Sequence, residues 1–123
     1  MWDFPDSQVA QRLIREIYET GGVVAAVCHG PSVLINAKLS DGAYLIAGKR
    51  VAAFSDEEEA EVQNINIVPF SLASSLIQHG GLYQSAQNWS ANVVVDGRLV
   101  TGQNPASAHG VGEAICKLIK ATA

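Results

Sequence analysis

The chain has 123 residues, about half of them apolar, and a formal net charge of −4. This length predicts a single domain over residues 1–123 with a core of its own, and the scattered cations argue against nucleic acid as a partner. No apolar run approaches the ~20 residues of a membrane helix, which argues against a membrane partner. The two cysteines, in a chain without a secretion signal, are expected to be free thiols in a reducing cytoplasm.

The first third of the chain predicts a helix, a strand and a second helix. Asp6 or Ser7 is expected to cap a helix with one apolar face that runs to about Thr20, where two glycines end it. The uninterrupted apolar run Val23–Val27 follows and suits a central parallel strand buried on both faces. Pro31 then predicts the first turn of the second helix.

The rest of the chain predicts two hairpins and three helices. The hairpins join Leu45-Ile46 to Val51–Phe54 around Gly48-Lys49, and Asn92–Val95 to Leu99–Thr101 around Asp96-Gly97. The helices are expected over Asp56–Val62, over Phe70–Gln78, and from Asn104-Pro105 to about Lys120. The alternation of helices and strands predicts an α/β fold. Because only one strand is typical of a parallel sheet, the sheet is expected to be incomplete.

Cys28 lies at the turn between the apolar strand and the following helix. Such a turn lifts a side chain above the carboxyl edge of the sheet, where α/β proteins place their ligands. The frame Ala26-x-Cys28-x-Gly30 resembles the small-x-nucleophile-x-small pattern of a nucleophile elbow. The N–H groups after Cys28 could favour a thiolate and hold an oxyanion. His29 is the adjacent base, and a carboxylate from Glu57, Glu58 or Glu59 could orient it.

Each of these residues also has a structural interpretation. A free cysteine in an apolar stretch is commonly a small core residue, and this interpretation is favoured for Cys116. A run of glutamates is ordinarily a solvated helix face. Trp89 could pack as a core aromatic or form the wall of a pocket, and Asn104 could simply cap a helix. The cysteines and histidines show no metal-ligand spacing.

Three segments carry a further signal. They are the segment from Gly21 to Pro31 around Cys28, the segment Gly48–Val51 with Phe54–Glu59, and the C-terminal segment Asp96–Ser107. Together they resemble the signatures of the ThiJ/PfpI superfamily, which is related to class I glutamine amidotransferases, and they appear in that family's order across nearly the whole chain. The version in this chain is most similar to the branch of stress-induced glutathione-independent glyoxalases, some of whose members are described as chaperones.

The resemblance implies a flavodoxin-like doubly wound sheet with a nucleophile elbow. It implies Cys28, His29 and Glu59 as the catalytic residues, and it points to Gly30, Trp89 and Asn104 as candidate oxyanion or substrate-binding residues. It further implies conversion of methylglyoxal to D-lactate, without a cofactor or metal, as a lyase of glyoxalase III type. The alternatives are a stress chaperone or redox sensor, and an amidase or peptidase.

The resemblance covers the C-terminal half of such proteins. The family also uses a glutamate from an early strand, for which this sequence offers no candidate. The N-terminal strands of the sheet are likewise expected to be missing. The expected partners are therefore a small 2-oxoaldehyde substrate and either a complementing N-terminal segment or a second copy of the chain.

Overall fold

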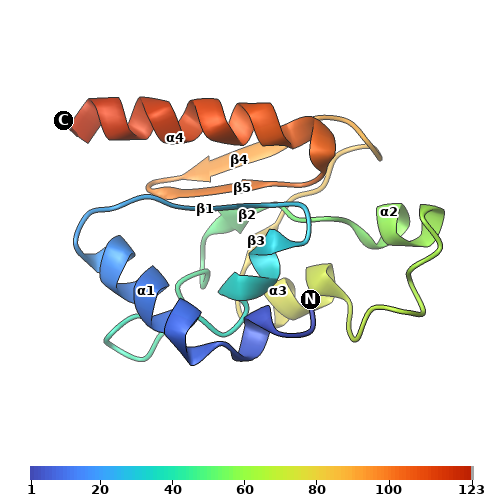
Figure 1. The fold of residues 1–123 in the computed structure, drawn as a ribbon, viewed down its shortest axis with the longest axis horizontal. Helices are drawn as coiled ribbons and strands as arrows, with labels where there is room; N and C mark the ends of the chain where they lie inside the picture. Colours follow the sequence, from blue (N-terminus) through green and yellow to red (C-terminus); the bar gives the residue numbers. More distant parts are fainter. Residues whose placement is uncertain (123) are drawn as a thin grey trace.

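The computed structural model describes residues 1–122, which fold around a small sheet (Figure 1). Strand β1 (Val24–Val27) pairs parallel with β5 (Leu99–Gly102). Strand β5 pairs antiparallel with β4 (Val93–Asp96), so the strand order is β1-β5-β4. The α/β class and the second predicted hairpin are thereby confirmed. Gly97 adopts a positive φ of 60°, which a tight hairpin turn requires and which glycine adopts readily.

Helices cover the sheet on two sides. Helix α4 (Ala108–Thr122) runs along one face, and helix α1 (Gln8–Glu19) lies on the opposite side (Figure 1). The predicted cap of α1 is present, because the side chain of Ser7 accepts a hydrogen bond from the Ala10 N–H at 3.2 Å. Two short 3₁₀ segments, η1 (Phe4–Asp6) and η3 (Pro105–Ser107), precede the two helices.

The middle of the chain contributes the remaining elements. Strand β2 (Arg50–Val51) pairs parallel with β3 (Leu82–Tyr83). Helix α2 (Asp56–Glu61) follows β2, and α3 (Leu72–Gln78) precedes β3. Both helices fall within the segments predicted for them.

The predicted hairpin between Leu45-Ile46 and Val51–Phe54 is wrong. Leu45 and Ile46 lie in a turn and are fully buried, so their apolar character reflects packing into the core rather than strand pairing. Strand β2 instead pairs with β3, a partner thirty-two residues further on. The sequence carried no signal for β3, which has two residues.

The segment after Cys28 is also different from the prediction. It forms a five-residue 3₁₀-helix, η2 (Gly30–Leu34), in place of a longer α-helix. Pro31 has no N–H to donate, and the hydrogen bonds that follow are of the short i→i+3 type, from Ser32 to His29 and from Ile35 to Ser32.

The core lies between the sheet and the elements on the α1 side. It draws residues from β1, η2, β2, α3 and β5 and from the turn before β2. Its buried members are Val24, Leu34, Ile35, Leu45, Ile46, Val51, Ala53, Leu72, Leu76 and Leu99. This cluster supports the ends of β1 and β2, from which the candidate site is built.

Strand β1 forms one edge of the sheet within residues 1–122. Val24 is buried, whereas Ala25, Ala26 and Val27 are half-buried. An apolar strand in this position is unusual, because natural edge strands are commonly short, charged or covered. Among residues 1–122, no strand pairs with the second edge of β1.

Candidate active site

Cys28 follows β1 directly and occupies a strained backbone conformation. Its φ is +66°, in a region that residues other than glycine rarely adopt. Strand β5 and the segment after β2 hold it there, because the Cys28 N–H donates to the Gly102 carbonyl at 3.0 Å and its own carbonyl accepts from the Phe54 N–H at 2.9 Å. Strain of this kind persists where the surroundings over-determine the backbone, which is common at functional sites. This is the geometry of a nucleophile elbow.

His29 lies between the thiol and a carboxylate. Its Nδ1 is 3.6 Å from the Cys28 Sγ, and its Nε2 is 2.7 Å from Oε2 of Glu59. The imidazole also packs against the ring of Phe54, with centroids 4.4 Å apart. The histidine therefore contacts both groups directly, and Phe54 restricts the orientation of its ring.

The pKa of His29 is raised to about 8 from its usual 6.5. The hydrogen bond with Cys28 is the largest cause. Partial burial lowers the pKa, whereas the hydrogen bond that the ring donates to Glu59 and the charges of both partners raise it. An imidazolium at neutral pH is thus a proton donor poised next to the thiol.

The three consecutive glutamates of α2 have three different environments. Glu59 is 4% exposed and contacts His29, Glu58 is fully buried in another direction, and Glu57 is exposed. Helix geometry separates them, because successive residues point about 100° apart. Of the three candidates that the sequence left open, Glu59 is the one whose carboxylate contacts His29. Its other oxygen, Oε1, is buried without a hydrogen-bond partner among the described residues.

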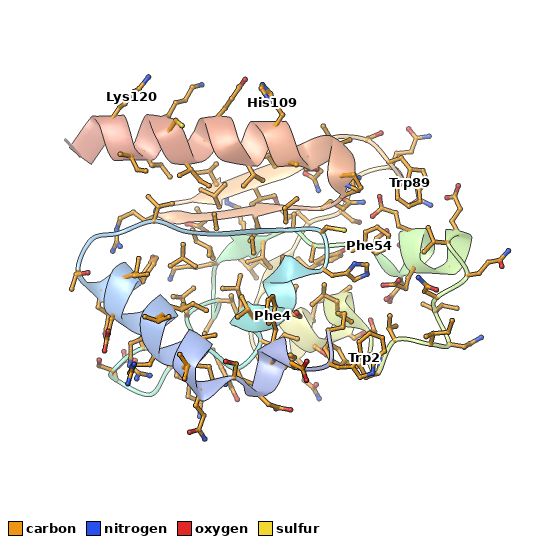
Figure 2. The ribbon with its side chains drawn as sticks, viewed as in Figure 1. Trp2, Phe4, Phe54, Trp89, His109 and Lys120 are labelled. Atoms are coloured by element: carbon orange, nitrogen blue, oxygen red, sulfur yellow. The ribbon has the colours of Figure 1, made fainter. Side chains whose placement is uncertain are left out.

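The other predicted binding residues differ in how they are placed relative to Cys28 and His29. Gly30 begins η2, two residues after the thiol. Trp89 is 40% exposed and meets Phe54 edge to face, with centroids 5.7 Å apart (Figure 2). It therefore extends the aromatic wall that Phe54 forms beside His29. Asn104 is fully buried: its amide donates to Glu58 and to the Ser90 carbonyl, and its oxygen accepts from Ser107. With both ends of its amide committed to protein groups, Asn104 has a structural role.

Sequence reasoning gave no role to Gln103 and treated Glu58 only as an alternative for Glu59. Both are fully buried and hydrogen bonded to each other at 3.0 Å. One signal was available. The pattern Ser55-x-x-Glu58 is a capping box, which the structure contains at the start of α2. That pattern places Glu58 near the helix N-terminus and turned towards Ser55.

Within residues 1–122, no group of three or more histidine, cysteine, aspartate or glutamate side chains could hold a metal ion. No helix in that range combines the length and the apolar character needed to cross a membrane.

Comparison with known proteins identifies the fold family. The family model described as DJ-1/PfpI matches residues 3–118. The chain belongs to the DJ-1/PfpI family. The resemblance inferred from the three sequence segments is thereby confirmed.

Two curated DJ-1/PfpI relatives illustrate the similarity. The probable glutathione-independent glyoxalase hsp3104 of Schizosaccharomyces pombe is 37% identical over 122 residues, which cover 93% of this chain and 54% of the relative. The glutathione-independent glyoxalase HSP31 of Saccharomyces cerevisiae is 38% identical over 117 residues, which cover 89% of this chain and 48% of the relative. The chain therefore spans about half the length of these curated relatives.

Solved DJ-1/PfpI structures agree with this assignment. The chain superimposes on glyoxalase III from Candida albicans with a TM-score of 0.90 and 32% identity, over 95% of this chain and 52% of that one. The rapid encystment protein of 24 kDa from Francisella tularensis gives a TM-score of 0.93 and 40% identity, over 95% and 52% of the two chains. The flavodoxin-like fold expected from the resemblance is consistent with both.

Proposed function

We propose that this chain carries the thiol site of a glutathione-independent glyoxalase that converts a 2-oxoaldehyde such as methylglyoxal into D-lactate. The observation that carries the proposal is the continuous contact from Cys28 through His29 to Glu59, set on a strained elbow. The names of the relatives support the reaction class. Free cysteines are consistent with a cytoplasmic site for this chemistry.

The reaction begins when the Cys28 thiolate adds to the aldehyde carbon. The carbonyl oxygen takes a proton from the His29 imidazolium, and a hemithioacetal forms. His29, now neutral, removes the proton from the former aldehyde carbon, and a proton is returned to the neighbouring carbon through an enediol. The product of this isomerisation is a thioester. Water cleaves it to release lactate and restore the thiol, so no external oxidant or reductant is consumed.

Glu59 orients His29 and stabilises its charged form, since its Oε2 lies 2.7 Å from Nε2. The same role belongs to the acid of other nucleophile–histidine–acid sites. Here the roles of the two ring nitrogens follow from chain geometry. His29 is adjacent to Cys28, so its nearer nitrogen Nδ1 faces the thiol and the distal Nε2 reaches the carboxylate.

Lactate formation from methylglyoxal by single-residue variants, measured with a complementing N-terminal segment present, tests this assignment. Cys28→Ala is expected to abolish turnover, and His29→Ala to cost about as much, because such residues act as a unit. Glu59→Gln is expected to cost less, and Glu57→Gln, the exposed neighbour, to leave the rate unchanged. Near-normal turnover in Cys28→Ala would rule out covalent catalysis. A larger loss in Glu57→Gln than in Glu59→Gln would show that the carboxylate is misassigned.

We further propose that the site works in a larger assembly. The unpaired edge of β1 and the exposed apolar residues of α1 (Val9, Leu13 and Ile17) support a partner segment that adds a strand and covers the helix. An N-terminal segment of the kind found in the longer relatives fits this requirement, and a second copy of the chain is the alternative. The same exposed surface supports a second candidate function, the binding of unfolded proteins.

A further inference from the structure

Glu58 is a fully buried carboxylate whose hydrogen bonds go to groups other than Cys28 and His29. It accepts five hydrogen bonds. Oε1 takes them from the N–H and hydroxyl of Ser55 and from the Gln103 amide at 3.0–3.1 Å, and Oε2 takes them from the Trp89 N–H and the Asn104 amide at 2.8–2.9 Å. All five donors are neutral. A buried charge is normally costly unless it is fully hydrogen bonded, so this arrangement is built around an ionised glutamate.

The five donors come from three separate parts of the chain. Ser55 begins α2, Trp89 belongs to the loop between β3 and β4, and Gln103 and Asn104 follow β5 directly. The carboxylate therefore joins the loop that carries Trp89 to the end of the strand whose Gly102 holds the Cys28 N–H. Glu58 also sits next to Glu59 in the same helix, so it links the walls of the site to the residue that contacts His29.

The backbone of Trp89 is held in an unfavourable conformation. Its φ is +63°, which costs free energy for a bulky residue, and its N–H donates to Oε2 of Glu58 at 2.9 Å. In this position the indole meets Phe54 edge to face, and Phe54 in turn packs on the His29 ring. Figure 2 shows Phe54 and Trp89 close to each other at one end of the molecule, beside α2. The position of the aromatic wall thus depends on the buried carboxylate.

We propose that Glu58 is a positioning residue of the thiol site. It holds Trp89 in place, and the indole in that position makes the site selective for reagents and substrates that carry an apolar group beside their electrophilic carbon. This inference deepens the proposed function and rests on Cys28 as the reacting thiol.

Replacing Glu58 by glutamine tests this arrangement, because no orientation of the glutamine amide satisfies all five donors. The Gln103 amide cannot rotate to compensate, since its oxygen already accepts from the Ala86 N–H and from Asn92. The Asn104 amide is fixed in the same way by Ser107 and the Ser90 carbonyl. Glu58→Gln therefore places an NH₂ group against a donor at one end or the other, while leaving the size of the side chain almost unchanged.

The experiment compares alkylation of Cys28 by iodoacetamide, which is small and polar, with alkylation by 2-bromoacetophenone, which carries a phenyl ring. Peptide mapping gives both rates at Cys28, and the exposed Cys116 provides an internal reference in the same molecule. The preference for the aromatic reagent is the ratio of its rate to the iodoacetamide rate at Cys28, divided by the same ratio at Cys116. Trp89→Ala is expected to lower the preference for the aromatic reagent at Cys28 by about two- to tenfold, the range for one lost aromatic contact. Glu58→Gln is expected to lower it by a similar factor, and Glu57→Gln to leave it unchanged.

The double variant separates positioning from a general structural effect. If Glu58 acts through Trp89, Glu58→Gln in the Trp89→Ala background changes the preference no further. Factors that multiply in the double variant, or an unchanged preference in Glu58→Gln, would overturn the proposal. If Cys28 reacts with neither reagent faster than Cys116 does, the proposed function fails instead, and the two failures are thereby distinguishable.

A measurement on the unmodified chain covers the case in which Glu58→Gln does not fold. The Trp89 and Gln87 amides lie in the same exposed loop, but only the Trp89 N–H is known to donate to the buried carboxylate of Glu58. Hydrogen exchange at Trp89 is therefore expected to be at least about tenfold slower than at Gln87. Equal exchange rates at the two amides would show that the carboxylate does not hold the loop, and would overturn the proposal.

Discussion

At the scale of single residues, the two cysteines provide a comparison within one molecule. Cys116 is exposed on α4, whereas Cys28 is half-buried. Accessibility alone would make Cys116 the faster to react. We expect the opposite, because the His29 imidazolium beside Cys28 favours the reactive thiolate.

Iodoacetamide labelling near neutral pH, followed by peptide mapping, measures this difference. Cys28 is expected to be modified faster than Cys116, and His29→Ala is expected to reduce or reverse the difference. Faster modification of Cys116 in the native protein would contradict the assignment of Cys28 as the reactive thiol.

The raised pKa of His29 makes stability depend on pH in a defined direction. A group with a folded pKa of about 8, above its usual 6.5, stabilises the fold fully below pH 6.5. This contribution is lost as the pH rises through 8. The free energy of unfolding is therefore expected to fall between pH 6.5 and 9, and the fall should be smaller in Cys28→Ala and in Glu59→Gln.

Urea unfolding at several pH values, with the NMR titration of the His29 ring, tests this expectation. Because the imidazole is 35% exposed, solvent screening reduces the size of the effect but not its direction. A ring that titrates at or below 6.5 would show that Cys28 and Glu59 do not outweigh the effect of burial on the pKa of His29.

At the scale of elements, the packing of α4 and η3 on β5 depends on a glycine. A Cβ at Gly102 would lie 2.7 Å from Val111, and 3.0 Å from both Ser107 and Val27. The contacts with Val111 and Ser107 are buried between β5 and the helical segments, so these two neighbours cannot move freely. The absence of a side chain lets the layers approach at the position where the Gly102 carbonyl accepts from the Cys28 N–H.

Gly102→Ala is therefore expected to destabilise the protein by about 1–3 kcal/mol, as overpacking of a core does. Gly112 is the matched control, because it lies in α4 with open space around it. Gly112→Ala is expected to stabilise the helix by about 0.5–1 kcal/mol. Denaturant unfolding compares the two variants, and equal effects would show that the contact at Gly102 is not tight.

At the scale of the whole molecule, the open edge of β1 bears on the stability of residues 1–123 alone. An unpaired buried backbone group costs about 1–3 kcal/mol, and a domain has only about 5–15 kcal/mol of net stability. A few such groups would remove most of it wherever the open edge of β1 is shielded from water without a partner, and the exposed apolar residues of α1 add to the cost. We therefore expect residues 1–123 to be stable only with a complementing segment or as a dimer, and to show little glyoxalase activity alone.

Sedimentation and thermal unfolding of these residues test this expectation. The transition temperature should rise with protein concentration if a second copy covers the edge, and with an added N-terminal segment of a longer relative if that segment is the partner. A cooperative, concentration-independent transition from a monomer would show that the described sheet is sufficient.

Local patterns in the sequence determined much of this protein. The apolar run before Cys28, the small residues at Ala26 and Gly30, and the adjacent His29 predicted a strand–elbow junction from short-range sterics alone. The Asp96-Gly97 turn predicted the β4–β5 hairpin for the same reason, and Ser7 predicted the start of α1. In each case the decisive interactions join residues that are near in sequence.

Only the tertiary structure decided which distant groups meet. A run of three glutamates left Glu57, Glu58 and Glu59 as alternatives on composition, and the family resemblance implied Glu59. The tertiary position of α2 brings the Glu59 carboxylate to within 2.7 Å of the His29 ring. The sequence predicts a strand at Leu45-Ile46, because an apolar pair looks the same in a strand and in a buried turn. The five partners of Glu58 and the parallel pairing of β2 with β3 join segments remote in sequence, and such pairings follow from packing in three dimensions.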